Sequence, residues 1–465
     1  MSIANTHFGA LSIGEMLKEV KSIYFIGIGG INMSSLAHIA HKRGFRVGGS
    51  DRTVTDITER LAARGITVNY SHAAENIADF DAVVYTVAIS EDNPEYLEAA
   101  RRGIPCISRA DFLGYVMSGY ARRIGISGTH GKSTCTSMCA ETFIRAGVSP
   151  TVLSGAELTL MGGAYTVGDG EDFVFEACEY MDSFLDFYPS VAVILNIDLD
   201  HVDYFRSLEQ MKRSFAEFAA KTGACGYAIA NTDDQNVKDA LKDYSGTVIS
   251  FGIDSEDALY RAVDVRSARG RYSFTVQKHG KPLCEVSLSV TGYHNIYNAL
   301  ACAAAADLSG LTGEDISRGL AAFRGAKRRM EYRGTLSGAE LYEDYGHHPT
   351  EIKTTLDGAR GLADGGRLVC VFQPHTYSRT AALFEDFVSS LSVADRVIVS
   401  DVYAAREVDT GVVSSKMLAD AIGERAVYGG DVRSAADVLK SELRADDVAV
   451  IMGAGNITDI FKYLL

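Results

Sequence analysis

The part of the sequence that most limits the fold is a glycine-rich turn between an apolar strand and a helix. The run RRIGIS (122–127) predicts a buried strand, and a helical pattern begins at Lys132 and continues to about Ala146. The letters between them, GTHG, are typical of a tight turn. Main-chain N–H groups at such a turn, and the positive end of the helix, can hold phosphate oxygens. The segment therefore predicts an α/β sheet that binds a nucleotide phosphate at one edge.

This turn matches a narrow form of the phosphate-loop motif. The general pattern requires a glycine five positions before Gly131, where Ile126 stands, but GTxGKST fits. Lys132 would supply a positive charge to the terminal phosphates, and Ser133 or Thr134 a hydroxyl to Mg²⁺. The residues that we expect to contact the nucleotide phosphates are Gly128, Thr129, His130, Gly131, Lys132, Ser133 and Thr134.

Acidic side chains follow the next two predicted strands. Glu176 and Glu179 follow the strand DFVFEA (172–177), and VAVILNI (191–197) leads into Asp198, Asp200, His201 and Asp203. The carboxyl ends of parallel strands meet at one edge of a sheet, where ligands bind in open α/β folds. Any one of these acids could equally cap a helix or face water. Together they favour a Mg²⁺ site beside the bound phosphates.

A second glycine turn, GIGGINM (27–33), stands near the start of the chain. Gly27 and Gly29 fit a dinucleotide fingerprint, but Asn32 occupies the position of its third glycine, and Asp51 ends the next strand. The turn predicts a diphosphate at the start of a helix without specifying which one. It leaves a nicotinamide-dependent oxidoreductase, or a purely structural turn, as alternatives.

The order of the patterns predicts three α/β domains. Strands and helices alternate up to about Tyr120, so residues 1–120 predict a Rossmann-like domain. Residues 121–326 predict a central parallel sheet of the phosphate-loop ATPase type. It carries an added β-hairpin, RYSFTVQKHGKPLCEVSLSV (271–290), which turns at KHGK. Residues 327–465 predict a second Rossmann-like domain. We expect hinges at Tyr120–Arg122 and Ala326–Arg328.

Composition narrows the class of protein. The 465 residues carry a formal net charge of −15, which argues against a sequence-independent grip on nucleic acid. The eight cysteines are scattered and form no CxxC pair, so we expect reduced thiols. Neither a signal peptide nor an apolar run of membrane length is found, which predicts a cytoplasmic protein without a membrane partner. A monomer and a weak homodimer are equally compatible with the sequence.

The order of several motifs resembles the Mur ligases. They are GIGGINM, GTHGKST, EACEYMDSF, NIDLDHVDYF, GYHNIYNA, RRMEYRG, EDYGHHPTE, FQPHTYSRT and GAGNI, and they extend from about Ile23 to the C-terminus. The resemblance implies that the first domain holds UDP-N-acetylmuramate, the second ATP, and the third admits the amino acid. It implies an ATP-dependent joining of L-alanine to the lactyl carboxylate of that nucleotide sugar through an acyl phosphate, in peptidoglycan synthesis.

The resemblance also implies roles for individual residues. Lys132 is expected on the ATP phosphates, Ser133 and Glu176 on Mg²⁺, and His201 on a second Mg²⁺. Further ATP contacts are implied at His294 and Asn295 (base), Arg328 (phosphates) and Asp344 (ribose). The residues implied for UDP-N-acetylmuramate are Gly27, Gly29, Gly30, Asn32, Met33, Asp51, His72 and Thr86. Those implied in the cleft between the amino acid and the muramyl carboxylate are Tyr345, His347, His348, His375 and Arg379.

Some positions depart from the family pattern, and the roles of some residues are undecided from the sequence. Asn32 stands where many members have Gly, Val87 where a small hydroxyl residue is common, and Cys178 where Asp is usual. His201, His348 and His375 are candidates to take the amine proton, and the sequence does not choose between them. A relative that adds a ready-made tripeptide to the same nucleotide sugar is the nearest alternative function. The more distant ones are the oxidoreductase and a non-catalytic nucleotide-binding protein.

Overall fold

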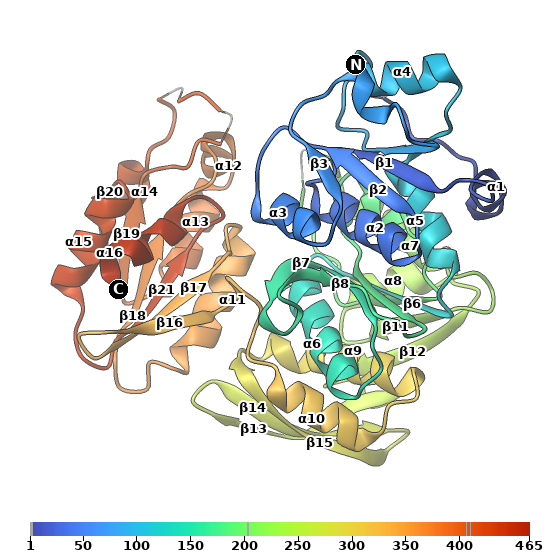
Figure 1. The fold of residues 1–465 in the computed structure, drawn as a ribbon. Coiled ribbons are helices and arrows are strands. Elements are labelled where there is room, and N and C mark those ends of the chain that lie inside the picture. The colour runs from blue at the N-terminus through green and yellow to red at the C-terminus, as the bar shows by residue number, and fades with distance from the viewer. Residues whose placement is uncertain (1–2, 202–203, 406, 410) are drawn as a thin grey trace. The chain divides into compact units, whose positions relative to one another are not determined.

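The computed structural model describes residues 3–201, 204–405, 407–409 and 411–465, so Asp203 lies outside the described residues. Strands and helices alternate along most of the chain (Figure 1). The fold divides into two compact units. Unit 1 is made of residues 1–251 and 304–311, and unit 2 of residues 252–303 and 312–465.

Unit 1 begins with a five-stranded parallel sheet in the order β3-β2-β1-β4-β5. Its strands are β1 (Ser22–Ile26), β2 (Arg46–Ser50), β3 (Thr67–Asn69), β4 (Ala82–Tyr85) and β5 (Cys106–Ser108). Its helices are α1 (Ala10–Met16), α2 (Ile31–Lys42), α3 (Asp56–Ala63), η1 (Ala74–Ile77), α4 (Pro94–Arg102) and α5 (Arg109–Ser118). The mostly apolar run DAVVYTVAI (81–89) is typical of a strand of that length, but β4 ends at Tyr85 because the chain turns there and Ile89 N donates to Thr86 O (3.2 Å).

The second sheet of unit 1 contains the phosphate-loop motif. Its order is β12-β11-β10-β6-β9-β7-β8, and only β8, at the edge, is antiparallel. The strands are β6 (Arg122–Ser127), β7 (Thr151–Leu158), β8 (Gly163–Thr166), β9 (Asp172–Glu176), β10 (Val191–Ile194), β11 (Tyr227–Asn231) and β12 (Thr247–Gly252). The helices are α6 (Lys132–Arg145), η2 (Thr159–Met161), η3 (Tyr180–Asp186), α7 (Leu208–Ala220) and α8 (Gln235–Leu241). β6 lies between β9 and β10, so the loop and both acidic segments leave the same edge.

The two sheets of unit 1 share one hydrophobic core. Side chains of α5, among them Phe112 and Val116, belong to the same buried cluster as Phe173 and Phe184 of the second sheet. Arg109 of α5 pairs with Asp186 of η3 at 2.8 Å. Tyr120, in the first predicted hinge, is buried in this core and its ring lies 5.0 Å from that of Phe173. Movement at this hinge stays a prediction.

Unit 2 contains the predicted hairpin. β14 (Arg271–Lys278) and β15 (Lys281–Thr291) pair antiparallel, with Lys278 opposite Lys281, which confirms the turn at KHGK. A third strand, β13 (Tyr260–Ala268), pairs with β14 and was not predicted. Helices α9 (His294–Leu308) and α10 (Gly313–Ala322) follow, and the end of α9 belongs to unit 1.

The C-terminal sheet of unit 2 is doubly wound. Its order is β16-β17-β21-β18-β19-β20, and only β16 is antiparallel. The strands are β16 (Glu331–Leu336), β17 (Ala339–Asp344), β18 (Leu368–Phe372), β19 (Arg396–Ser400), β20 (Ala426–Gly430) and β21 (Val448–Met452). The helices are α11 (Pro349–Arg360), α12 (Tyr377–Ala382), α13 (Phe384–Leu391), α14 (Ser415–Ile422), α15 (Val432–Glu442), η4 (Ile457–Ile460) and α16 (Phe461–Leu464).

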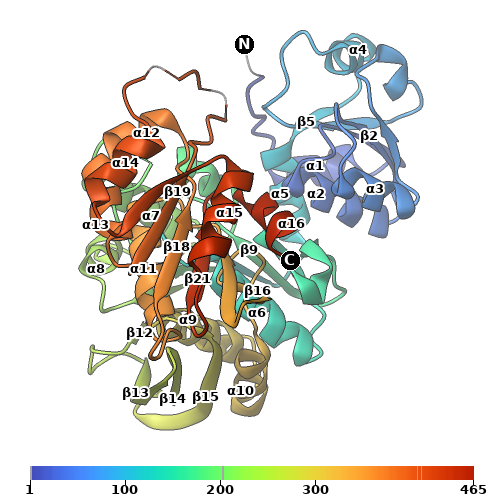
Figure 2. The same cartoon turned by 90° about the vertical axis from the view of Figure 1, so that its left-hand side faces the viewer.

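Alternate residues of these strands build two cores. Leu368, Cys370 and Phe372 of β18 pack with α11, α13 and α14, whereas Val369 and Val371 pack with α15, η4 and α16. Figure 2 shows α15 and α16 on one side of the sheet and α11 and α13 on the other. The predicted fold class, three α/β parts with a parallel central sheet and an added antiparallel region, is confirmed. The boundaries at residues 120 and 326 stay predictions.

The shared core of unit 1 predicts a large cost for truncating Phe184. This fully buried ring stacks on Phe218 at 4.7 Å and meets Phe215 edge-on at 5.3 Å. We expect Phe184→Ala to lower the free energy of unfolding by about 3–5 kcal/mol, measured by urea denaturation. Leu11→Ala, at a side chain that is 90% exposed, is the control and should cost less than about 0.5 kcal/mol. Equal effects of the two substitutions would contradict a core at this position.

Candidate active site

The glycine turn after β6 is fixed by hydrogen bonds to the segment that follows β10. His130 N donates to the side-chain oxygen of Asn196 (2.8 Å), and the Asn196 amide donates back to His130 O (3.0 Å). Thr129 Oγ1 donates to Asp198 O (3.0 Å) and accepts from Asp198 N (2.9 Å). Gly131 ends the turn at φ 84° and begins α6 without a capping side chain. The first turn of α6 therefore keeps donors for an anion, as the sequence predicted.

Lys132 is held inside this turn by a buried carboxylate. Its ammonium donates to Gly128 O (2.7 Å) and Thr129 O (3.1 Å), and lies 2.8 Å from Glu179 Oε2. The Lys132 side chain is 13% exposed and that of Glu179 is fully buried. Burial by itself lowers the pKa of Lys132, but Glu179, with Cys178 and Glu176 acting in the same direction, holds that pKa above its ordinary value. The cation that the sequence assigned to ATP phosphates is therefore present, charged and paired.

The predicted metal ligands fall into two groups. Ser133 Oγ donates to Glu176 Oε1 (3.1 Å), and Gly155 N donates to Glu176 Oε2 (2.7 Å). A Cβ on Gly155 would lie 2.5 Å from Glu176 Oε1, so only glycine leaves room for this carboxylate. His201 lies instead beside Glu179, with Nε2 at 3.4 Å from Oε1, and this contact raises the pKa of His201.

These residues fit a magnesium ion that is held mainly by phosphate. The described residues contain no cluster of three or more His, Cys, Asp or Glu side chains ready to hold a metal. Mg²⁺ in nucleotide sites takes only one or two carboxylates and otherwise binds water and phosphate oxygens. A serine hydroxyl in contact with a half-buried carboxylate at a phosphate loop is a donor set of that kind. The ion itself stays a proposal.

The N-terminal turn is built around the end of β2. Gly27 N and Ile28 N both donate to Ser50 O (2.8 and 2.9 Å), and Gly29 N donates to Asp51 Oδ2 (2.9 Å). A Cβ on Gly29 would lie 2.6 Å from that carboxylate. Asp51 therefore shapes the turn. Helix α2 begins at Ile31, and Gly30 before it provides no side-chain cap, which leaves the first N–H groups of the helix for an anion.

The other residues predicted to bind the nucleotide sugar differ in how far their side chains are exposed. Gly30 and Asn32 are exposed, whereas the Met33 side chain is buried, so Met33 offers only its main chain. Thr86 lies against Gly27, where a Cβ would meet its Cγ2 at 2.8 Å. His72 Nδ1 lies 2.7 Å from Oε2 of Glu95, a fully buried carboxylate that also accepts from Tyr24, Ser50 and Asn76. Glu95 thereby fixes the ring of His72 at the edge of the sheet.

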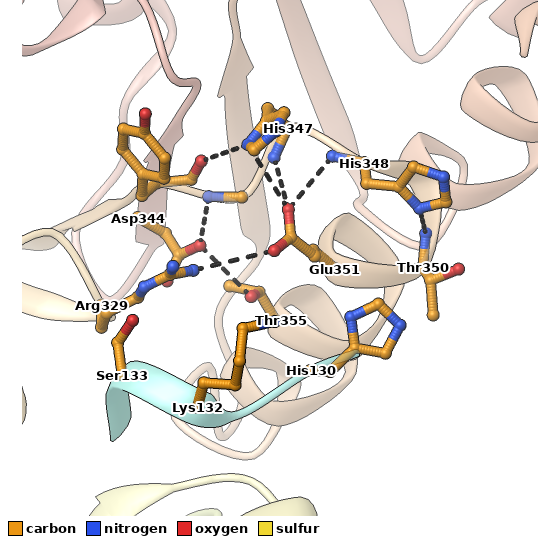
Figure 3. A network of polar contacts seen from close by, with 12 residues as sticks. His130, Lys132, Ser133, Arg329, Asp344, His347, His348, Thr350, Glu351 and Thr355 are labelled. Carbon is orange, nitrogen blue, oxygen red and sulfur yellow. Dashed lines mark hydrogen bonds and ion pairs between the residues drawn. The ribbon is translucent and has the colours of Figure 1, made fainter. Parts of the chain in front are cut away.

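Unit 2 carries a second set of candidate residues around Asp344, at the end of β17 (Figure 3). The Asp344 carboxylate accepts from Met330 N (2.9 Å) and Gly346 N (2.8 Å) and is buried, which raises its pKa. Arg328 pairs through Nε with the buried Glu343 (2.8 Å) and donates to Gly453 O (2.8 Å). Its guanidinium also lies over the ring of Tyr345, 4.8 Å from the centroid. These contacts fix Asp344 and Arg328, the residues predicted to bind the ribose and the phosphates, to the C-terminal sheet.

The tandem histidines lie at the start of α11. Glu351 Oε2 accepts from the main-chain N–H of His347 (3.1 Å) and of His348 (3.2 Å), as Figure 3 shows. The ring of His347 lies 5.5 Å from that of Tyr345 and 6.0 Å from that of His375. Arg379 donates to His375 O at 3.1 Å. The structure thus brings together all five residues that were predicted for the amino-acid cleft.

The two residues predicted for the adenine base differ in what they offer. His294 lines a cavity of about 360 Å³ within unit 2, with Tyr293 beside it and Thr354 and Asp357 of α11 in its wall. The Asn295 amide donates to Thr291 O (2.7 Å) and accepts from Asn298 (2.9 Å). The Asn295 side chain is therefore engaged by its neighbours at the start of α9, and of the two residues only His294 lines the cavity.

Several residues that build the site were not assigned from the sequence. Asn196, Glu95 and Glu351 each hold a predicted ligand through two or more hydrogen bonds. Asn196 stands at the end of a buried strand, which is a usable signal. Glu95 and Glu351 stand in the first turn of a helix after proline, where they are indistinguishable from ordinary helix starts.

Known proteins match the chain along most of its length. Three sequence models match in order: the Mur ligase family catalytic domain at residues 22–121, the Mur ligase middle domain at 126–306 and the Mur ligase glutamate ligase domain at 328–455. A UDP-N-acetylmuramate–L-alanine ligase of Clostridium tetani is 43% identical, over 95% of this chain and 97% of that protein. Its counterpart from Caldanaerobacter subterraneus is 44% identical, over 97% and 98%.

Solved structures agree with these matches. The UDP-N-acetylmuramate–alanine ligase of Thermotoga maritima aligns with a TM-score of 0.76 at 28% identity, over 95% of this chain and 98% of that one. A murein peptide ligase of Psychrobacter arcticus shares the fold, with a TM-score of 0.66 at 24% identity, over 96% and 98%. In the described part of the chain, every helix is too short or too polar to span a bilayer.

The buried pair of Lys132 and Glu179 predicts how substitutions combine. Lys132→Met removes the ammonium that pairs with the buried Glu179 carboxylate, which then keeps only His201 beside it, and should cost about 3–5 kcal/mol of unfolding free energy. Adding Glu179→Gln removes the unpaired charge and should restore most of that loss, while nucleotide binding stays absent. Urea denaturation measures the first effect, and titration with ADP the second. Lys416→Met, at an exposed pair with Asp420, is the control and should leave the unfolding midpoint unchanged.

Proposed function

The chain belongs to the Mur ligase family, and from this premise we propose that it joins L-alanine to the lactyl carboxylate of UDP-N-acetylmuramate at the expense of ATP, a step of peptidoglycan synthesis. The observation that carries the proposal is the 42–44% identity, over nearly the whole chain, to ligases named for this reaction. The intact phosphate loop and the tandem histidines supply chemistry that such a ligase needs.

The N-terminal turn is the proposed binding site of the UDP diphosphate. The uncapped start of α2 and the N–H groups around Gly30 suit an anion, and the side chain of Asn32 is exposed beside them. His72 and Thr86 stand at the same edge of the sheet and are proposed to contact the nucleotide sugar. Two separate phosphate-binding turns then serve two separate nucleotides, which explains why the chain has both.

ATP is proposed to bind at the loop that begins at Gly128. Lys132 would exchange its carboxylate partner for phosphate oxygens, and Arg328 would add a second positive charge. Ser133, Glu176 and His201 would hold magnesium, which when bound neutralises phosphate charge and orients the triphosphate. His294 would face the base and Asp344 the ribose.

The proposed chemistry overcomes the poor reactivity of a carboxylate. The lactyl carboxylate attacks the γ-phosphorus of ATP, ADP leaves, and the resulting acyl phosphate is an electrophile. The amine of L-alanine then attacks the acyl carbon and inorganic phosphate leaves. Phosphoryl transfer of this kind depends mainly on positioning and on charge neutralisation, and Lys132 and Arg328 would supply the positive charge.

The remaining alternatives are less well supported. Addition of a tripeptide is represented by the murein peptide ligase, which at 24% identity shows the shared fold alone. An oxidoreductase would leave the phosphate loop without a use. A cytoplasmic location and a monomer or weak homodimer stay predictions, as does discrimination against glycine and serine.

Phosphate release from ATP, in the presence of UDP-N-acetylmuramate and Mg²⁺, tests the proposal. We expect turnover with L-alanine and none with the tripeptide, because the relatives with 42–44% identity are alanine-adding enzymes. Glycine and L-serine are included to measure specificity, and absorbance at 340 nm with a nicotinamide cofactor should not change. Turnover with the tripeptide alone, or none with L-alanine, would overturn the proposal.

A further inference from the structure

The atoms around His347 fix the position of its ring proton. Nδ1 lies 3.2 Å from the carbonyl oxygen of Tyr345 and 3.5 Å from Glu351 Oε2. Both oxygens only accept hydrogen bonds, so Nδ1 must carry the proton to satisfy either of them. In the neutral ring Nε2 is then a bare lone pair. Figure 3 shows His347 with its contacts to Glu351 and to the carbonyl group.

The neighbouring histidine has the opposite arrangement. The main-chain N–H of Thr350 donates to Nδ1 of His348 (3.3 Å), because His348 is the N-cap of α11. Nδ1 of His348 therefore has no proton, and the neutral ring carries it on Nε2. His375 follows the same rule, since Arg379 Nη1 lies 3.4 Å from its Nδ1 and a guanidinium only donates.

These contacts divide the three rings into one acceptor and two donors. We propose that His347 is the proton acceptor for the amine of L-alanine, and that His348 and His375 present N–H donors to substrate oxygens. The proposal rests on the proposed ligase function. Across the described residues, no hydrogen-bond partner is found for Nε2 of His347. From the sequence alone, His201, His348 and His375 were the candidates for this role and His347 was a lining residue.

The surroundings of His347 keep the ring neutral. Burial is the main cause that lowers its pKa, and the positive charge of Arg379 and any charge on His375 act in the same direction, while Glu351 and the hydrogen bond to the Tyr345 carbonyl raise it. Glu351 of α11, Arg379 of α12, His375 after β18 and Tyr345 after β17 are the titratable and charged groups found against the ring in the described residues. A pKa below the usual range for histidine leaves the basic form present at neutral pH.

The proton balance of the step is complete. L-Alanine arrives as an ammonium ion and must lose one proton to expose its lone pair. Nε2 of His347 takes that proton and becomes an imidazolium, while the amine nitrogen bonds to the acyl carbon. As the C–O bond to phosphate breaks, the second proton of the nitrogen leaves with phosphate. The imidazolium returns its proton to solvent after the product departs.

A comparison of two nucleophiles tests the role of His347. His347→Asn keeps an N–H donor for the Tyr345 carbonyl but has no atom in the place of Nε2. With L-alanine we expect its kcat to fall by about 10²–10⁴, the usual worth of a general base. Hydroxylamine is already unprotonated at neutral pH and traps the same acyl phosphate. We therefore expect hydroxamate formation by the variant to stay within twofold of the unaltered enzyme.

The control variant is His348→Asn. It keeps an acceptor for the N–H of Thr350 and a good N-cap, but loses the Nε2 donor. Since a donor to substrate oxygens serves both nucleophiles, we expect its rates with L-alanine and with hydroxylamine to fall by the same factor. His347→Gln is measured beside His347→Asn, with circular dichroism of each variant, so that one misfolded protein does not decide the result.

The outcomes separate this inference from the proposed function. If the unaltered enzyme forms hydroxamate, and both His347 variants lose the two reactions equally or lose neither, His347 is not the proton acceptor, although the ligase function stands. If the unaltered enzyme forms neither hydroxamate nor the alanine product, the proposed function fails and the role of His347 falls with it. Selective loss of the alanine reaction supports the assignment.

Discussion

The parallel order of the strands β9, β6 and β10 is the constraint on which the nucleotide site depends. Parallel neighbours end at the same edge, so the glycine turn after β6 meets Glu176 of β9 and the Asn196–Asp198 segment after β10. The turn is then held by hydrogen bonds to Asn196 and Asp198. Lys132 could not be kept charged in a buried place without Glu179, which arrives from the same edge. Packing of the sheet thereby decides the electrostatics of the site.

Much of this arrangement was predictable, because it follows from local patterns. The strand–turn–helix at 122–146 and the hairpin turn at KHGK are set by periodicity and turn chemistry, and both are found. The strand β13 escaped because its polar edge residues hide the alternation, and β4 is shorter than expected because a turn interrupts an apolar run. The sequence did not predict which side chains pair with one another at the site. Nothing near Lys132 in sequence indicates Glu179, and nothing near His347 indicates which ring nitrogen carries the proton.

Buried or partly buried carboxylates recur as the supports of functional side chains. Glu179 holds Lys132, Glu95 holds His72, Glu343 holds Arg328, and Glu351 holds the main chain of the tandem histidines. Each acid is either distant in sequence from the residue that it holds or stands close to it in a pattern that does not indicate this role. Groups fixed in this way lose little freedom when a ligand arrives, so less binding energy is spent on ordering them. The acidic composition of the chain is thus partly a set of internal supports.

The continuous core of unit 1 has a consequence for modularity. Gly114 lets α5 approach Tyr188 so closely that a Cβ would lie 2.5 Å from its ring, and Phe112, Val116 and Tyr120 continue into the core of the second sheet. A polypeptide cut after residue 120 would expose this apolar face to water. The N-terminal fold is therefore not a cassette that can be transplanted between relatives by itself, and chimaeras of this family should exchange both sheets together.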